Sequence, residues 1–119
     1  MVSRRLLENY RIAVVEAEIA FEVNIDELVT KYYRNEGWSA FEIDNIMKAG
    51  LKNLLTDHIP KSCDEPFVGT EEHTAWERDL YSLRNRIIHD GVAVTAMETQ
   101  KALDAAEKAL EWISEQASK

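Results

Sequence analysis

Apolar residues recur at steps of three and four along much of this chain, and this periodicity constrains the fold more than any other feature. The longest run extends from about Arg4 to Tyr33. Its stripe consists of Tyr10, Val14, Ala17, Phe21, Ile25, Leu28 and Tyr32. A repeat near 3.6 residues is that of an α-helix with one buried face. The 119 residues include only four glycines and two prolines, which disfavours a turn-rich β fold. We therefore expect an all-α protein.

The same stretch carries a second apolar stripe beside the first. Its members are Ile12, Val15, Ile19 and Val23. One stripe is enough to pack a helix into a bundle, so two stripes indicate a helix buried from two sides. The second side faces either a partner subunit or the rest of the same domain around a central helix, and the sequence favours neither.

A second helix begins at Ser39, which forms a capping box with Glu42. The hydroxyl and the carboxylate satisfy each other's free backbone amides. Trp38 and Ile43 stand at the positions of a hydrophobic staple. The apolar stripe continues to Leu55, past Gly50. Glycine lowers helix stability, and we expect it to admit a close neighbour here.

Residues 57–69 are expected to form a long loop that contains Pro60, Cys63 and Pro66. Loops of this length in compact domains are often functional. His58, Cys63 and His73 lie in or beside it, but their spacing matches no zinc motif. We expect no metal and no cofactor.

A third helix is expected from about Thr70 to Asp90-Gly91, and a fourth from the capping box of Thr95 and Glu98 to about Gln116. The third helix has a core stripe of Trp76, Leu80, Leu83 and Ile87. The inward residues of the fourth are Leu103, Ala106, Leu110 and Ile113, with Ala102, Ala105 and Ala109 allowing close helix approach. Trp38, Trp76 and Trp112 are expected in the core or in a staple. Four helices predict an antiparallel up-down bundle in a single domain, 1–119.

Composition narrows the setting. The single cysteine, Cys63, excludes an internal disulfide and favours a reducing, cytoplasmic location. No apolar run follows the basic residues of the N-terminus, so no signal peptide is indicated, and no segment has the length of a membrane span. The net charge of −8 argues against a broad nucleic-acid-coating surface. Arg78, Arg84 and Arg86 nevertheless lie close together and predict a local cationic cleft.

The third helix ends in Arg84-Asn85-Arg86-Ile87-Ile88-His89. Histidine titrates near neutral pH and is suited to proton transfer, and arginine is a permanent cation suited to a phosphate in its transition state. The pattern of arginine, a polar residue, three further residues and histidine resembles the motif of the HEPN superfamily, which includes many metal-independent ribonucleases. The four-helix expectation agrees with the architecture of that family.

The resemblance implies a catalytic set of Arg84, Asn85 and His89, with Arg86 and Arg78 as further RNA contacts. His89 would assist attack of the RNA 2′-hydroxyl or protonate the leaving 5′-oxygen, leaving a 2′,3′-cyclic phosphate and a 5′-hydroxyl. Arg84 would bind the phosphate, and Asn85 would orient His89 or the phosphate. Glu16, Glu18 and Glu22 on the first helix are expected to form its polar face, with a place in a site near the middle of that helix as the alternative.

Arg84 and His89 are five residues apart, which is about 140° around an α-helix. They therefore point in different directions within one subunit. HEPN ribonucleases usually build a composite site from two copies of the motif, so the resemblance implies a homodimer. The second apolar stripe is a candidate for its interface.

One HEPN branch, found as toxins beside nucleotidyltransferase antitoxins, carries a tyrosine two residues after the histidine. This chain has Gly91 there, which argues against regulation by that route. The leading hypothesis is a ribonuclease acting as a toxin or phage-defence effector, with RNA, a second subunit and an antitoxin or regulatory protein as partners. The alternatives are a non-catalytic HEPN module that dimerises and senses a nucleotide or binds a protein, and a helical scaffold in which the motif occurs by chance.

Overall fold

The computed structural model describes residues 4–119, and every regular element in this range is a helix. The all-α prediction is therefore confirmed. Residues 1–3, part of the stretch considered for a signal peptide, lie outside the described residues. The elements are α1 (Arg4–Asn35), α2 (Ala40–Met47), α3 (Leu51–Asn53), the π-helical turn η1 (Leu54–His58), α4 (Ile59–Cys63), α5 (Glu71–Ala75), the π-helical turn η2 (Trp76–Tyr81), α6 (Ser82–Asp90) and α7 (Ala96–Ala117).

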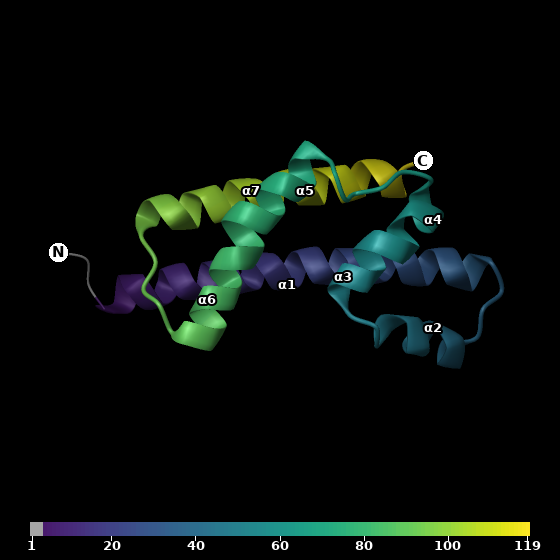
Figure 1. Cartoon of the computed structure of the whole chain (residues 1–119), viewed down its shortest axis with the longest axis horizontal. Coiled ribbons are helices and arrows are strands. Elements are labelled where there is room, and N and C mark those ends of the chain that lie inside the picture. Colours follow the sequence, from purple (N-terminus) through teal and green to yellow (C-terminus); the bar gives the residue numbers. More distant parts are fainter. Residues whose placement is uncertain (1–3) are drawn as a thin grey trace.

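Helices α1 and α7 lie side by side along the long axis of the molecule (Figure 1). They run in the same direction. Near the beginning of both, Arg11 donates hydrogen bonds to the carbonyl oxygens of Gly91 and Val92, which precede α7. Near the end of both, Tyr32 and Gln116 line the same small cavity. The buried alanines of α7 allow the close approach: Ala102, Ala105, Ala106 and Ala109.

The joined segment α5–η2–α6 crosses this pair obliquely (Figure 1). Its Trp76 is 1 % exposed and packs against Phe21 of α1, with ring centroids 5.1 Å apart. Phe67, from the loop before α5, fills the space beside them and lies 5.0 Å from the ring of Trp112 on α7. Aromatic pairs at these separations add to the stability given by burial alone. This aromatic core fixes the position of α6, which carries the Arg-Asn-His motif.

Elements that follow one another without a break form five continuous helices in the described chain, rather than the four that the sequence predicted: α1, α2, α3–η1–α4, α5–η2–α6 and α7. Helix α2 ends before Gly50, whose φ of 93° is a conformation that glycine adopts easily and other residues avoid. A new helix begins at Leu51. A Cβ atom at Gly50 would meet nothing within 4 Å, so the expected close packing against this glycine is also wrong.

The predicted loop at 57–69 is largely wrong as well. Residues up to Cys63 are helical, and only 64–70 connect α4 to α5. Pro60 lies in the first turn of α4, two residues after the end of η1. Proline has no N–H for the carbonyl four residues back. The wider π-helical turn before it is one way in which a helix accommodates such a break in its hydrogen-bond ladder.

Several apolar side chains that the sequence predicted to be covered are exposed. Ile12 and Ile19 are 51 % exposed and Val23 is 46 % exposed. The second stripe of α1 is therefore not buried within the domain, so the central-helix alternative is wrong, while the partner-subunit alternative stays a prediction. Trp38 is 41 % exposed and packs one face on Tyr33. Leu103 also faces outward, contrary to its prediction.

Candidate functional site

Helix α6 carries the motif in its last two turns. It continues from η2 without a break and ends at Gly91, as the sequence predicted. Gly91 has a φ of 63° and donates its N–H to the carbonyl of Ile87. This left-handed cap stops the helix two residues after His89. The imidazole therefore lies at the C-terminal end of α6, where no further helical turn covers it.

Arg84 and Asn85 are joined by a hydrogen bond in which Arg84 Nη1 donates to Asn85 Oδ1 at 3.1 Å. Both side chains are half-buried. Arg84 Nε is buried and has no hydrogen-bond partner among the described residues. Burial raises the pKa of Glu18 and of Glu22, and the charge of the Arg84 guanidinium opposes both rises, so the guanidinium lies close to the middle of α1. The arginine is thus oriented by its neighbour and keeps unused donor capacity.

His89 is exposed and makes no hydrogen bond or ion pair with any residue in the range 4–119. Asn85 lies one helical turn before it on the same face. No hydrogen bond or ion pair links Arg84 to His89 within that range, in keeping with their separation of about 140° on the helix. One subunit therefore presents the arginine and the histidine on different sides of α6, and they do not converge on one point.

Glu18 is the residue that sequence reasoning misjudged. It is 0 % exposed and accepts a hydrogen bond from the indole Nε1 of Trp76 at 3.1 Å. Its second carboxyl oxygen has no partner among the described residues. Burial raises its pKa from 4.5 to about 8; the Trp76 hydrogen bond lowers the pKa, the charge of Glu22 raises it and that of Arg84 lowers it. The polar-face prediction is wrong for Glu18, although it holds for the exposed Glu16.

A signal for this burial was present in the sequence. Glu18 stands four residues after Val14 and three before Phe21, which are both fully buried. Positions at these offsets share a helix face. The carboxyl group therefore belongs to the core stripe, and only its charge suggested the surface.

The two arginines expected to add RNA contacts lie on the other flank of this segment, against α7. Arg78 pairs with Asp79 at 2.8 Å, and Arg86 pairs with Glu98 of α7 at 3.5 Å. Both line a cavity of about 170 Å³ that also includes Lys101. The structure thus brings Arg78 and Arg86 together but separates them from Arg84, because two residues along a helix is about 200° around its axis.

The remaining histidines and the cysteine do not gather into one site. Tyr33 Oη and His58 Nδ1 are 2.7 Å apart and hydrogen-bonded. Cys63 donates its thiol hydrogen to backbone carbonyls, and burial raises the pKa of that thiol. Within the part of the chain that the structure describes, no three His, Cys, Asp or Glu side chains are grouped as metal ligands.

Comparison with known proteins finds no relative of this chain. No family model, no curated protein and no solved structure matches the chain. Across residues 4–119, none of the helices combines the length and apolar character that crossing a membrane requires. The site must therefore be interpreted from its own residues.

Proposed function

We propose that this protein is a metal-independent endoribonuclease of the HEPN type, with Arg84, Asn85 and His89 as its catalytic residues. One observation carries the proposal. An exposed histidine without a partner follows, on the same helix, a hydrogen-bonded arginine–asparagine pair. Arg84 is half-buried, and its Nε is a buried donor with no hydrogen-bond partner among the described residues.

The roles follow from the chemistry of the three side chains. His89 removes the proton of the RNA 2′-hydroxyl or gives one to the departing 5′-oxygen, and neutral pH suits both tasks. Arg84 binds the phosphate and stabilises the additional negative charge of the pentavalent state. Asn85 holds Arg84 through its side-chain oxygen and leaves its amide N–H groups for the phosphate. The products are a 2′,3′-cyclic phosphate and a 5′-hydroxyl.

A single subunit leaves Arg84 and His89 apart, so the proposed active form is a homodimer. A two-fold axis near α6 would place the histidine of one copy opposite the arginine of the other. The exposed stripe of α1, formed by Ile12, Ile19 and Val23, is the proposed contact surface. Helix α6 crosses α1 (Figure 1), so the motif lies on an element that contacts the helix carrying this stripe. A toxin or defence role, regulated by a partner protein in the cytoplasm, fits this activity.

The test is cleavage of a mixed RNA by the purified protein in EDTA. The wild type is expected to cut and to leave cyclic phosphate ends. His89→Ala is expected to lower the rate by about 10²–10⁴-fold, the usual contribution of a placed proton-transfer group. His58→Gln is the matched control, because it removes a histidine far along the chain and retains a hydrogen-bonding group beside Tyr33. Equal activity of His89→Ala and wild type would refute the assignment.

A second function is favoured by the charges. Arg78 and Arg86 are already paired with carboxylates, and the chain carries a net charge of −8, both of which weaken attraction to RNA. These facts fit a non-catalytic module that dimerises or binds another protein. A folded dimer that cuts no RNA and binds none would favour this second function.

A further inference from the structure

A cavity of about 200 Å³ lies on the side of Trp76 that faces α3 and η1. Its walls come from three separate parts of the chain: Lys52 and the residues of η1, the loop before α5, and the stretch from His73 to Glu77. The two π-helical turns meet here. Leu55 belongs to η1, and Trp76 belongs to η2. Such turns are rare and occur frequently at functional sites. The proposed ribonuclease mechanism does not use this cavity.

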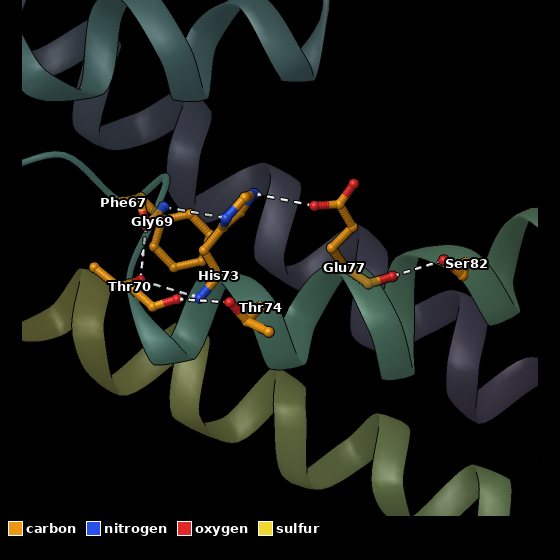
Figure 2. A network of polar contacts seen from close by, with 7 residues as sticks. All are labelled: Phe67, Gly69, Thr70, His73, Thr74, Glu77 and Ser82. Atoms are coloured by element: carbon orange, nitrogen blue, oxygen red, sulfur yellow. Dashed lines mark hydrogen bonds and ion pairs between the residues drawn. The ribbon is translucent and has the colours of Figure 1, made fainter.

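The polar groups of the cavity are held in place. Thr70 accepts a hydrogen bond from the backbone N–H of His73 and donates one to the carbonyl of Phe67, which fixes the start of α5 (Figure 2). The N–H of Gly69 donates to Nδ1 of His73 at 3.3 Å. A neutral imidazole that accepts at Nδ1 carries its proton on Nε2.

That Nε2 lies 3.5 Å from a carboxylate oxygen of Glu77 (Figure 2). The cavity therefore presents a hydrogen-bond donor directly beside an acceptor with two oxygens. Lys52 adds a second donor and a positive charge, and its ammonium lies 5.3 Å from the centre of the Tyr81 ring. Leu55 and Trp76 provide an apolar floor.

This arrangement selects a class of ligand. The volume is below the roughly 300–1,000 Å³ of sites for drug-sized molecules, so the ligand is small. Alternating donors and acceptors above an apolar floor suit a flat heterocycle. The edge of guanine carries the acceptor O6 next to the donors N1–H and N2–H. O6 would accept a hydrogen bond from Lys52 or His73. The N1–H and N2–H groups would donate hydrogen bonds to the two carboxylate oxygens of Glu77.

We propose that this cavity is a binding site for a guanine base. The base belongs either to a free nucleotide or to an RNA that also reaches Arg84, seven residues along the helix from Glu77. The binding itself does not depend on the proposed function, whereas its use in choosing RNA substrates does. Adenine fits less well because its ring nitrogen N1 has a lone pair and no hydrogen for the carboxylate.

The experiment is a titration of the ¹⁵N-labelled His89→Ala protein with guanosine, adenosine and uridine monophosphates, followed by NMR. Guanosine monophosphate is expected to shift the amide signals of Thr56, Val68, Gly69 and Glu77. It is expected to bind at least about tenfold more tightly than the other two, since an unpaired polar edge is strongly rejected. Glu77→Gln is expected to lose at least about tenfold in affinity, because one oxygen acceptor becomes a donor. Glu71→Gln, on the exposed first turn of α5, is the matched control.

Absence of these shifts, equal binding of adenosine monophosphate, or unchanged affinity in Glu77→Gln would overturn the proposal. RNA cleavage distinguishes the two sources of the base. If the wild type cuts next to guanine and Glu77→Gln loses that preference, the base belongs to the substrate. If guanosine monophosphate binds in the cavity but no RNA is cut, the proposed ribonuclease function fails and the site binds a free nucleotide.

Discussion

Glu18 has a fully buried carboxyl group that accepts one hydrogen bond, from Trp76. Such a group is tolerated when it stays neutral, and its raised pKa of about 8 means that it holds its proton at neutral pH. A neutral Glu18 contributes no negative charge beside Arg84, whose other acidic neighbour is Glu22. A protonated Glu18 is therefore compatible with a neighbouring Arg84 that forms no ion pair with it.

This pKa makes stability depend on pH. The unfolded chain releases the Glu18 proton near pH 4.5, whereas the folded protein holds it to about pH 8. Between these values the folded state binds more protons, so its stability falls as pH rises, by up to about 1.4 kcal/mol per pH unit. The stabilisation is fully present below pH 4.5 and lost above about pH 8.

Glu18→Gln should remove most of this dependence, because an amide accepts the Trp76 hydrogen bond and does not titrate. Urea unfolding at several pH values between about 5 and 8 measures the free energy of unfolding of both proteins. The variant is expected to show the flatter curve. Glu16→Gln, at an exposed position of the same helix, should follow the wild type. Identical slopes in Glu18→Gln and wild type would show that Glu18 is ionised in the folded protein.

At the scale of elements, helix ends followed the local sequence closely. The capping boxes at Ser39–Glu42 and Thr95–Glu98 are both present with reciprocal hydrogen bonds. Each hydrogen bond also lowers the pKa of its glutamate. Capping depends on residues within four positions of one another, which explains why the sequence alone predicted these boundaries.

Gly50 sets a boundary that the sequence left undetermined. Its positive φ costs any L-residue about 1–2 kcal/mol, while a Cβ atom would meet nothing within 4 Å. Gly50→Ala is therefore expected to lower the free energy of unfolding by about 1–2 kcal/mol through backbone strain alone.

Denaturant unfolding monitored by circular dichroism measures this loss. Gly50→Asn is the matched comparison: at φ 93° and ψ 166° the backbone is in a region adopted essentially by glycine alone, so asparagine should lose about as much as alanine. A stabilised Gly50→Ala protein would mean that α2 and α3 join into one continuous helix in solution.

At the scale of the whole molecule, three apolar residues of α1 remain about half exposed: Ile12, Ile19 and Val23. Large apolar residues scattered singly on a surface need no explanation, but these three lie on one helix face. The proposed composite site needs a second copy close to α6. We propose that one surface meets both requirements.

Ile19→Glu tests this pairing. A charged side chain at the centre of the stripe should separate the subunits, because an unpaired buried charge is strongly unfavourable. Light scattering after gel filtration is expected to give a dimeric wild type and a monomeric variant, and the monomer should lose RNA cleavage. Folding should persist, since Ile19 is 51 % exposed in the subunit. Glu115→Lys, at an exposed position of α7, should remain a dimer. A wild type that is monomeric at all concentrations would contradict the composite site.

The sequence by itself determined the helical class, both capping boxes, the end of α6 at Gly91 and the position of the motif on that helix. These features depend on periodicity and on neighbours within a few residues. Only the tertiary structure decided the rest. The predicted second helix is split at Gly50, and the helix that follows it continues through Pro60. Glu18 is buried beside Trp76. Arg86 turns toward α7 and Arg84 toward α1, which separates the two arginines. The burial of Glu18 and the separation of the arginines depend on packing between residues far apart in the chain. A local sequence pattern does not determine which distant element will pack against a given residue.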